Sequence, residues 1–104
     1  MPSQTNGCAA PAGGLGLVGR DLTREAVIQG TVLQSGRPVP AAYVRLLDRS
    51  GEFTAEVQTD NEGAFRFFAG EGTWTLRVLV PATDVVDRVV HAATGAISEV
   101  TITV

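Results

Sequence analysis

The sequence predicts an all-β fold, a sandwich of seven antiparallel strands, and three observations carry this prediction. Short segments in which apolar and polar residues alternate recur from residue 26 onward, as expected of strands with one face in a core. Clusters of Gly, Pro, Asn, Asp and Ser interrupt these segments every 8–12 residues or so, at roughly the spacing typical of sandwiches. No segment shows a convincing helical period.

Each strand is bounded by turn residues and has a predicted inner face. Alternation places Ile28, Val44, Phe65 and Leu76 in the core, together with every second residue beside them. Phe53 is expected on the same face as Ala55 and Val57. The expected strands lie at residues 26–33, 42–48 and 53–58, around Phe65 and Phe67, and at residues 73–80, 85–91 and 97–104.

Two regions need separate justification. Residues 84–92 have a spacing that resembles a helix, but their four valines favour a strand, with a weak phase because Val85-Val86 and Val89-Val90 are doublets. Residues 60–63, Asp-Asn-Glu-Gly, are typical of a hairpin turn. The aspartate can bond the backbone and Gly63 can adopt the left-handed conformation.

The first part of the chain differs in composition from the rest. Residues 1–23 are rich in Gly and Ala and show no apolar period, so we expect a flexible N-terminal arm followed by the sandwich domain at residues 24–104.

Composition excludes several classes of protein. The 104 residues include 8 arginines, no lysine and 11 acidic residues, so the net charge of −3 argues against nucleic-acid and membrane-surface binding. A single cysteine cannot form an internal disulfide. Neither a long apolar run nor a charged leader is visible, so we expect a cytoplasmic protein.

Spaced motifs carry a resemblance to known families. The pattern Ile28-x-Gly30-x-Val32 is followed by Gly36-x-Pro38-Val39, by Thr59-Asp60-x-x-Gly63-x-Phe65-x-Phe67 and by Gly72-x-Trp74-x-Leu76-x-Val78. This succession resembles carboxypeptidase-regulatory-like domains, which have the transthyretin-like (prealbumin-like) sandwich. The resemblance implies that fold and no particular reaction.

A second resemblance covers most of the chain from Cys8 onward. It is carried by the runs Cys-Ala-Ala-Pro at residues 8–11, Val-Arg-Leu-Leu-Asp at 44–48, Phe-Thr-Ala-Glu-Val at 53–57 and Phe-Arg-Phe-Phe-Ala at 65–69. These are similar to the small actinobacterial SseC-like family of unknown function, which is encoded beside rhodanese-type thiosulfate sulfurtransferases. The resemblance implies a link to sulfur metabolism and supplies no catalytic residues.

The sole thiol, Cys8, is the candidate sulfur acceptor. A sulfur carrier needs an accessible thiolate on a segment that can reach a partner's active site, and a Gly/Ala-rich arm provides that reach. No basic residue lies within ten positions to lower its pKa. The alternative is an incidental cysteine in a tail.

No cofactor or metal is expected. His91 is the only histidine, whereas metal sites need several His or Cys ligands. Intradiol dioxygenases, which have a related sandwich, bind iron with two Tyr and two His, but Tyr43 is the only tyrosine here. The Asp60 turn lacks the alternating carboxylates of a calcium loop.

Three arginines form the other candidate site. Alternation turns Arg45, Arg66 and Arg77 outward, with Glu56 in the same phase. One interpretation is a solvated face with Arg–Glu pairs across strands; the other is a cluster that binds an anion or an acidic partner. Four apolar residues are expected to point outward or to lie at strand ends, and such residues favour self-association or the binding of a partner protein. They are Tyr43, Leu47, Phe68 and Leu79.

We therefore expect a non-enzymatic accessory or interaction protein, because the chain offers no nucleophile–base pair, acid–base dyad or metal cluster. The resemblance makes a rhodanese-type thiosulfate sulfurtransferase the expected partner, with Cys8 as its sulfur acceptor. The alternative is a generic binding or structural module that recognises a peptide, a carbohydrate or its own copy and has no sulfur role. An enzyme whose site forms only between subunits is a third hypothesis.

Overall fold

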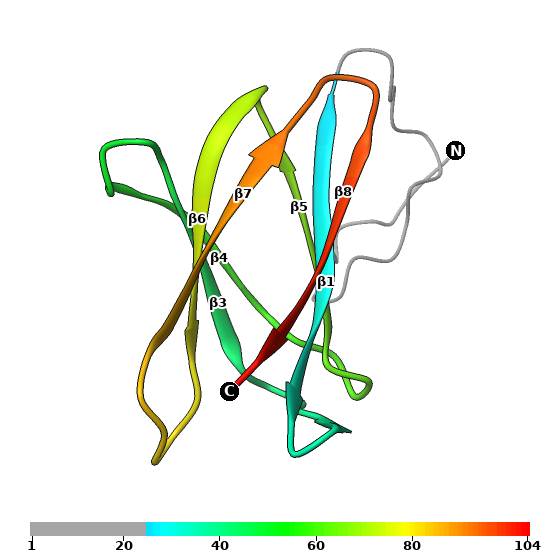
Figure 1. The fold of residues 1–104 in the computed structure, drawn as a ribbon, viewed down its shortest axis with the longest axis vertical. Helices are drawn as coiled ribbons and strands as arrows, with labels where there is room; N and C mark the ends of the chain where they lie inside the picture. Colours follow the sequence, from blue (N-terminus) through cyan, green and yellow to red (C-terminus); the bar gives the residue numbers. More distant parts are fainter. Residues whose placement is uncertain (1–24) are drawn as a thin grey trace.

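The computed structural model describes residues 25–104, which form two facing β-sheets (Figure 1). Every regular element in this part of the chain is a strand. The strands are β1 (Ala26–Gln34), β2 (Arg37–Pro38), β3 (Tyr43–Leu47), β4 (Phe53–Gln58), β5 (Ala64–Ala69), β6 (Gly72–Leu79), β7 (Val86–Ala92) and β8 (Ile97–Thr103).

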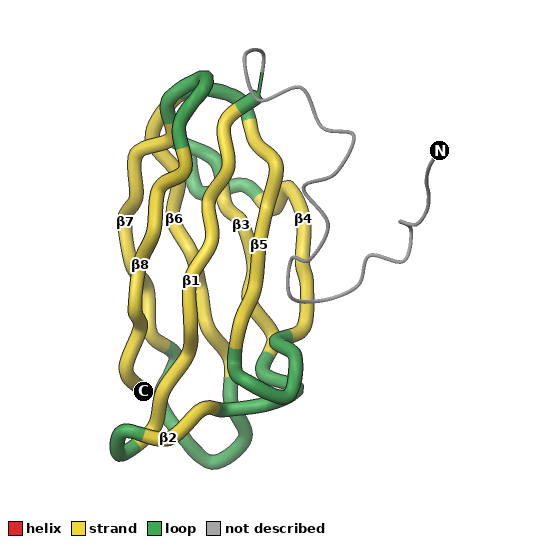
Figure 2. Tube along the Cα trace, turned by 90° about the vertical axis from the view of Figure 1, so that its right-hand side faces the viewer, coloured by secondary structure: helices red, strands yellow, loops and turns green. Residues whose placement is uncertain are grey.

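The two sheets have four strands each. Sheet A consists of β1 with β5 and the short β2, and β8 also pairs with β1. Sheet B has the order β4-β3-β6-β7. Figure 2 looks onto sheet A, with β7 and β8 along one lateral side of the sandwich and β4 and β5 along the other.

The predicted all-β sandwich is confirmed, with two differences in detail. There are eight strands in the described residues rather than seven, because Arg37 and Pro38 form a two-residue strand opposite Gln34 and Leu33. All paired strands are antiparallel except β1 and β8, which run parallel from Val27↔Ile97 to Leu33↔Thr103. The last strand of the chain, β8, thus lies beside the first, β1, in sheet A.

The core lies between the inner faces of the two sheets, as alternation predicted. Ile28 of β1, Phe65 of β5, Val44 of β3 and Leu76 of β6 are each almost completely buried. The rings of Phe65 and Phe67 pack with centroids 6.2 Å apart at an interplanar angle of 59°, a tilted arrangement that aromatic pairs favour.

The turn at residues 60–63 has the predicted chemistry but a different place in the fold. Asp60 Oδ1 accepts the N–H of Glu62 at 2.8 Å and that of Ala64 at 3.0 Å, and Gly63 has φ 75°. The prediction of a hairpin was wrong, because β4 pairs with β3 while β5 pairs with β1. The turn carries the chain from one sheet to the other.

The first residue of β4 was also assigned to the wrong face. The register shifts between Leu46 and Leu47, so that Leu46 lies opposite Ala55 but Leu47 lies opposite Phe53. Thr54 is therefore the extra residue of a β-bulge, which reverses the side of the sheet to which the preceding residue points. Phe53 shares the outer face with Leu47 and is 62% exposed.

Candidate functional site

The outer face of sheet B carries three parallel rows of side chains, and we call it the sheet-B face. Residues directly opposite each other on neighbouring strands project from the same side of a sheet. The pairings therefore define one charged row between two largely apolar rows. The charged row is Glu56, Arg45, Arg77 and Asp87; one neighbour is Phe53, Leu47, Thr75 and Val89; the other is Gln58, Tyr43 and Leu79.

The charged row consists of two ion pairs placed side by side. Arg45 Nε lies 2.7 Å from Glu56 Oε2. Arg77 donates from Nε and Nη2 to the two carboxylate oxygens of Asp87, at 2.9 Å each. These hydrogen bonds lower the pKa of Asp87 below 3.8 and raise that of Arg77.

The charge balance of this row determines what kind of ligand Arg45 and Arg77 can bind. Arg45 and Arg77 lie directly opposite each other, which brings two like charges together. Each is compensated by a carboxylate on its other side, so the row as a whole carries no net charge. A neutral, ordered row suits recognition of a complementary protein surface better than capture of a free anion.

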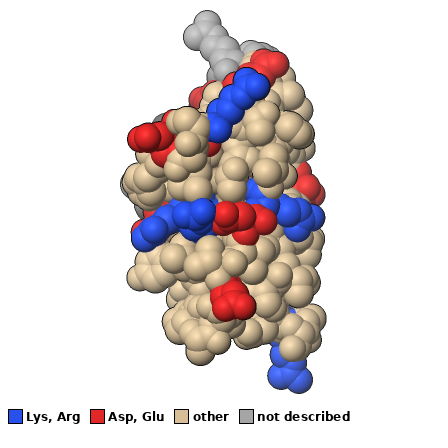
Figure 3. Space-filling model, turned by 60° about the vertical axis from the view of Figure 1, so that its left-hand side comes forward, with Lys and Arg blue, Asp and Glu red and all other residues tan. Residues whose placement is uncertain are grey.

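The rows on either side expose large apolar side chains. Tyr43 is 46% exposed, Phe53 62% and Val89 59%. Val85, directly before β7 and in the same phase as Asp87, is 53% exposed. The space-filling view shows the charged band crossing the middle of the surface, with mostly uncharged surface directly above and below it (Figure 3).

The valine doublets explain part of this surface. Val86 and Val90 belong to the core or pack against it, whereas Val85 and Val89 point outward. Of the four apolar residues predicted here from their phase, Tyr43 and Leu79 lie on this face, Leu47 lies on it but is buried at 6% exposure, and Phe68 belongs to sheet A. Sequence reasoning missed Val85, Val89 and Phe53. The doublets were the available signal, because a strand with apolar residues in both phases has two apolar faces.

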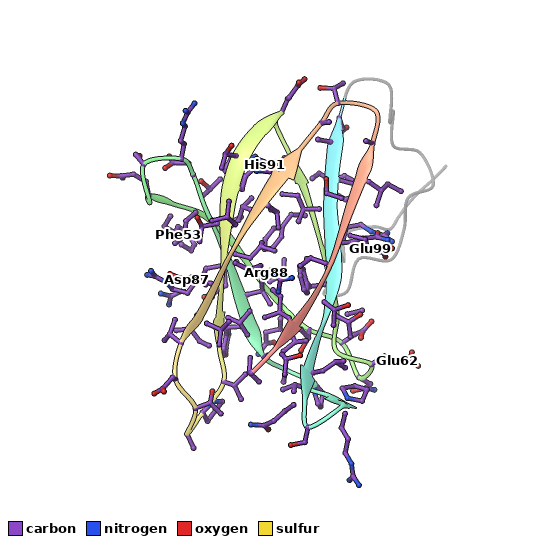
Figure 4. The ribbon with its side chains drawn as sticks, viewed as in Figure 1. Phe53, Glu62, Asp87, Arg88, His91 and Glu99 are labelled. Carbon is purple, nitrogen blue, oxygen red and sulfur yellow. The ribbon has the colours of Figure 1, made fainter. Side chains whose placement is uncertain are left out.

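Arg66 lies away from the other two arginines. It belongs to β5 in sheet A, whereas Arg45 and Arg77 belong to sheet B, so the three predicted arginines do not share a face. Arg66 Nε donates to Gln29 Oε1 at 2.8 Å, and Gln29 Nε2 donates to Glu99 Oε2 at 2.8 Å. Partial burial lowers the pKa of Arg66, and the charge of Glu99 opposes that shift. Figure 4 shows Asp87 and Glu99 on opposite sides of the sandwich.

The other predicted site residues contribute no further cluster. Cys8 and the expected arm at residues 1–23 lie outside the described residues. His91 is exposed on β7, where its Nδ1 lies 3.1 Å from Thr73 Oγ1. Within residues 25–104, no three His, Cys, Asp or Glu side chains are grouped closely enough to hold a metal ion. The same residues contain no helix long and apolar enough to cross a membrane.

The fold and this face define a β-sandwich domain with an exposed apolar and ion-paired surface. The chain belongs to the DUF1416 family, described as a protein of unknown function, whose model matches residues 8–104. It is 48% identical over 95 residues to the uncharacterised protein Rv0814c of Mycobacterium tuberculosis, covering 89% of this chain and 94% of that protein. An uncharacterised protein of Mycolicibacterium smegmatis is 53% identical over 79 residues, which are 75% of this chain and 86% of that protein.

Solved structures with low sequence identity share the fold. The chain is similar to the Bacillus anthracis TIE protein, with a TM-score of 0.68 and 15% identity over 77% of this chain and 16% of that one. It is also similar to a dioxygenase domain from Streptomyces sp. SirexAA-E, with a TM-score of 0.63 and 9% identity over 84% of each chain. BcpA, the major pilin subunit of Bacillus cereus, has a TM-score of 0.57 and 16% identity over 77% of this chain and 29% of that chain. At these identities the likeness concerns the fold alone.

Proposed function

We propose that the chain is a non-enzymatic protein-binding module that docks on its partner through the sheet-B face. The observation that carries this proposal is the exposure of Tyr43, Phe53, Val85 and Val89 around one ordered row of ion pairs. Aromatic and aliphatic side chains that lose water on binding supply most of the affinity of protein interfaces, and ordered polar groups fix the orientation.

The finer part of the proposal concerns the partner. The resemblance to the SseC-like family favours a cytoplasmic rhodanese-type thiosulfate sulfurtransferase, and Cys8 would then accept its sulfur. In that step the Cys8 thiolate attacks the outer sulfur of the enzyme's persulfide. A new S–S bond forms on Cys8, the S–S bond of the enzyme breaks, and the enzyme leaves as a thiolate.

Binding and sulfur transfer are tested separately. Calorimetric titration with the sulfurtransferase should give a complex that Val89→Asp weakens more than about tenfold, because a buried carboxylate without a partner is costly. Val89→Thr, which keeps the branched shape of valine, is the matched control and should weaken the complex much less. A wild-type protein that does not bind the enzyme contradicts the proposed partner.

The second measurement is the intact mass without reductant after incubation with thiosulfate and active sulfurtransferase. The proposal expects a gain of one sulfur atom that is absent in Cys8→Ser. Binding without any gain leaves a docking module with no sulfur role. If light scattering shows a dimer that Val89→Asp dissociates, the sheet-B face serves self-association instead.

A further inference from the structure

The sandwich has two lateral sides, and the strands at one of them are tied across the gap between the sheets. Arg88 Nη1 of β7 donates to the carbonyl oxygen of Thr101 in β8 at 3.0 Å. Ser98 Oγ of β8 donates to the carbonyl oxygen of His91 in β7 at 2.7 Å. In Figure 4, Arg88 lies between the two strands. Two backbone acceptors at this side, the carbonyl oxygens of Thr101 and His91, are therefore already bonded within the chain.

The opposite side presents β4, which pairs with β3 alone among the described strands. The Thr59 N–H donates to the carbonyl oxygen of Ala42 at 2.9 Å, which fixes the phase of hydrogen bonding between the strands. Antiparallel pairing alternates, so Ala55 and Val57 bond to β3. Glu56 and Gln58 then direct their N–H and C=O groups away from the sheet.

Residues 55–58 of β4 carry few of the devices that usually protect a sheet edge. Edge strands are blunted by proline, by lysine or by bulges along their length. The sequence of β4 is Phe-Thr-Ala-Glu-Val-Gln, and its bulge at Thr54 leaves residues 55–58 in regular register. Its one charged residue, Glu56, forms an ion pair with Arg45 of the neighbouring strand β3.

The charge around β4 indicates what kind of strand could be added there. Residues 48–62 contain five carboxylates, at Asp48, Glu52, Glu56, Asp60 and Glu62. The opposing charges are Arg49 in the same segment and Arg45 of β3, which is paired with Glu56, so a negative excess remains around this edge. A second copy of the same edge would bring the same negative charge, and like charges facing each other across strands are destabilising. An extended segment with basic side chains is complementary instead.

The side chains of β4 indicate which residue types such a segment needs at each position. Glu56 ends the charged row of the sheet-B face, and its Oε2 accepts from Arg45 Nε. Its second oxygen, Oε1, has no hydrogen bond within residues 25–104, so within this part of the chain it stays available to a basic side chain of an added strand. On the inner side Ala55 and Val57 are half-buried against the core, so apolar residues suit the alternate positions.

From this geometry we propose that the β4 edge binds an extended basic segment of a partner protein as a fifth strand of sheet B. The segment alternates basic side chains, in line with Glu56, and apolar side chains, in line with Ala55 and Val57. Main-chain hydrogen bonds to Glu56 and Gln58 supply affinity, and the alternation supplies specificity. This edge is distinct from the apolar surface of the sheet-B face.

The probe is a blocked peptide of alternating valine and arginine, about seven residues long, which matches a typical strand. It is titrated into the full chain while hydrogen exchange is followed residue by residue. The amides of Glu56 and Gln58 should become protected on binding, whereas those of Ala55 and Val57 are already bonded to β3. A peptide with the same charge but N-methylated at alternate positions should bind at least about tenfold more weakly, because it lacks the bonding donors.

Two pairs of variants separate strand addition from simple charge attraction. Gln58→Pro removes an outward N–H that no strand within residues 25–104 uses, so the fold is retained while affinity falls about tenfold or more. Gln58→Ala is the matched control. Glu56→Gln should weaken binding by about three- to tenfold at low salt and hardly at high salt, whereas Glu99→Gln on sheet A should not weaken it.

Equal affinity of Gln58→Pro and Gln58→Ala overturns the proposal, because the peptide is then held by charge without main-chain pairing. Protection of Glu56 and Gln58 in a dimer without peptide also overturns it, in favour of a second copy. The Val89→Asp variant leaves this edge intact. Failure of sulfurtransferase docking and failure of peptide binding are therefore distinguishable.

Discussion

Replacing Gly30 by alanine tests whether β1 and β8 approach each other as closely as the structure shows. A Cβ atom at Gly30 would lie 2.0 Å from the carbonyl oxygen of Val100, 2.9 Å from Val100 Cγ1 and 3.0 Å from Phe65 Cζ. A side chain could rotate away from the methyl group, but the carbonyl belongs to the backbone of the neighbouring strand. The two strands must separate locally for alanine to fit.

The size of the effect follows from where the separation would occur. Gly30 lies opposite Val100 in the middle of the parallel pairing, and Phe65 beside it is a fully buried core residue. Overfilling a packed site typically costs about 1–3 kcal/mol, and more where the backbone must move. Because the nearest atom here is backbone, we expect Gly30→Ala to lower the free energy of unfolding by about 3 kcal/mol or more.

Urea unfolding followed by tryptophan fluorescence measures this change, since Trp74 packs against the core. Gly70→Ala is the matched control: nothing lies within 4 Å of its Cβ position, so the same substitution should be neutral or stabilising by about 0.4–1 kcal/mol. A Gly30→Ala protein as stable as the wild type, with an unchanged denaturant slope, would refute the close approach of β1 and β8.

Three further substitutions test individual contacts. Thr59 is 4% exposed, and its Oγ1 accepts from the Ala42 N–H at 2.9 Å and donates to the Val39 carbonyl at 2.6 Å. Thr59→Val should lower the free energy of unfolding in urea by about 1–3 kcal/mol, because both backbone groups lose their partner. Arg88→Met removes the bond to the Thr101 carbonyl, so hydrogen exchange of β8 should accelerate while that of β3 stays unchanged. Asp87 has its pKa lowered by Arg77, so the folded value lies below the unfolded value of 3.8; its stabilisation is present above pH 3.8 and is lost as the pH falls through the folded value. The stability difference between the wild type and Asp87→Asn should therefore shrink as the pH drops below 3.8, and a constant difference would contradict the ion pair.

Alternation in the sequence was sufficient to assign most side chains to a face, but not to assign strands to sheets. Val44, Phe65 and Leu76 lie in the core as predicted, because a period of two is a local property of a strand. Arg66 was grouped with Arg45 and Arg77 because all three share the outward phase. Phase does not indicate which sheet a strand joins, and the turn at residues 60–63 takes β5 into the other sheet.

Other differences arise from long-range or irregular structure. The parallel pairing of β1 with β8 joins residues about 70 positions apart, such as Gln29 and Glu99, and no local pattern indicates such a neighbour. The bulge at Thr54 has no distinctive residue such as glycine, so the reversal of Phe53 could not be foreseen. The valine doublets, in contrast, did indicate that valines lie on both faces of the chain at β7.

The exposed apolar residues of sheet B have a purely structural explanation that must be weighed against a docking role. Valine and aromatic residues favour strands, so Val89 and Tyr43 contribute to the sheet even when they face water. Val89→Thr preserves that contribution and Val89→Asp does not, which is why the pair is informative. If propensity alone accounted for Val89, aspartate would reduce stability with little effect on binding. A docking surface predicts the reverse, because a residue that is 59% exposed contributes little to the core but is buried when a partner covers it.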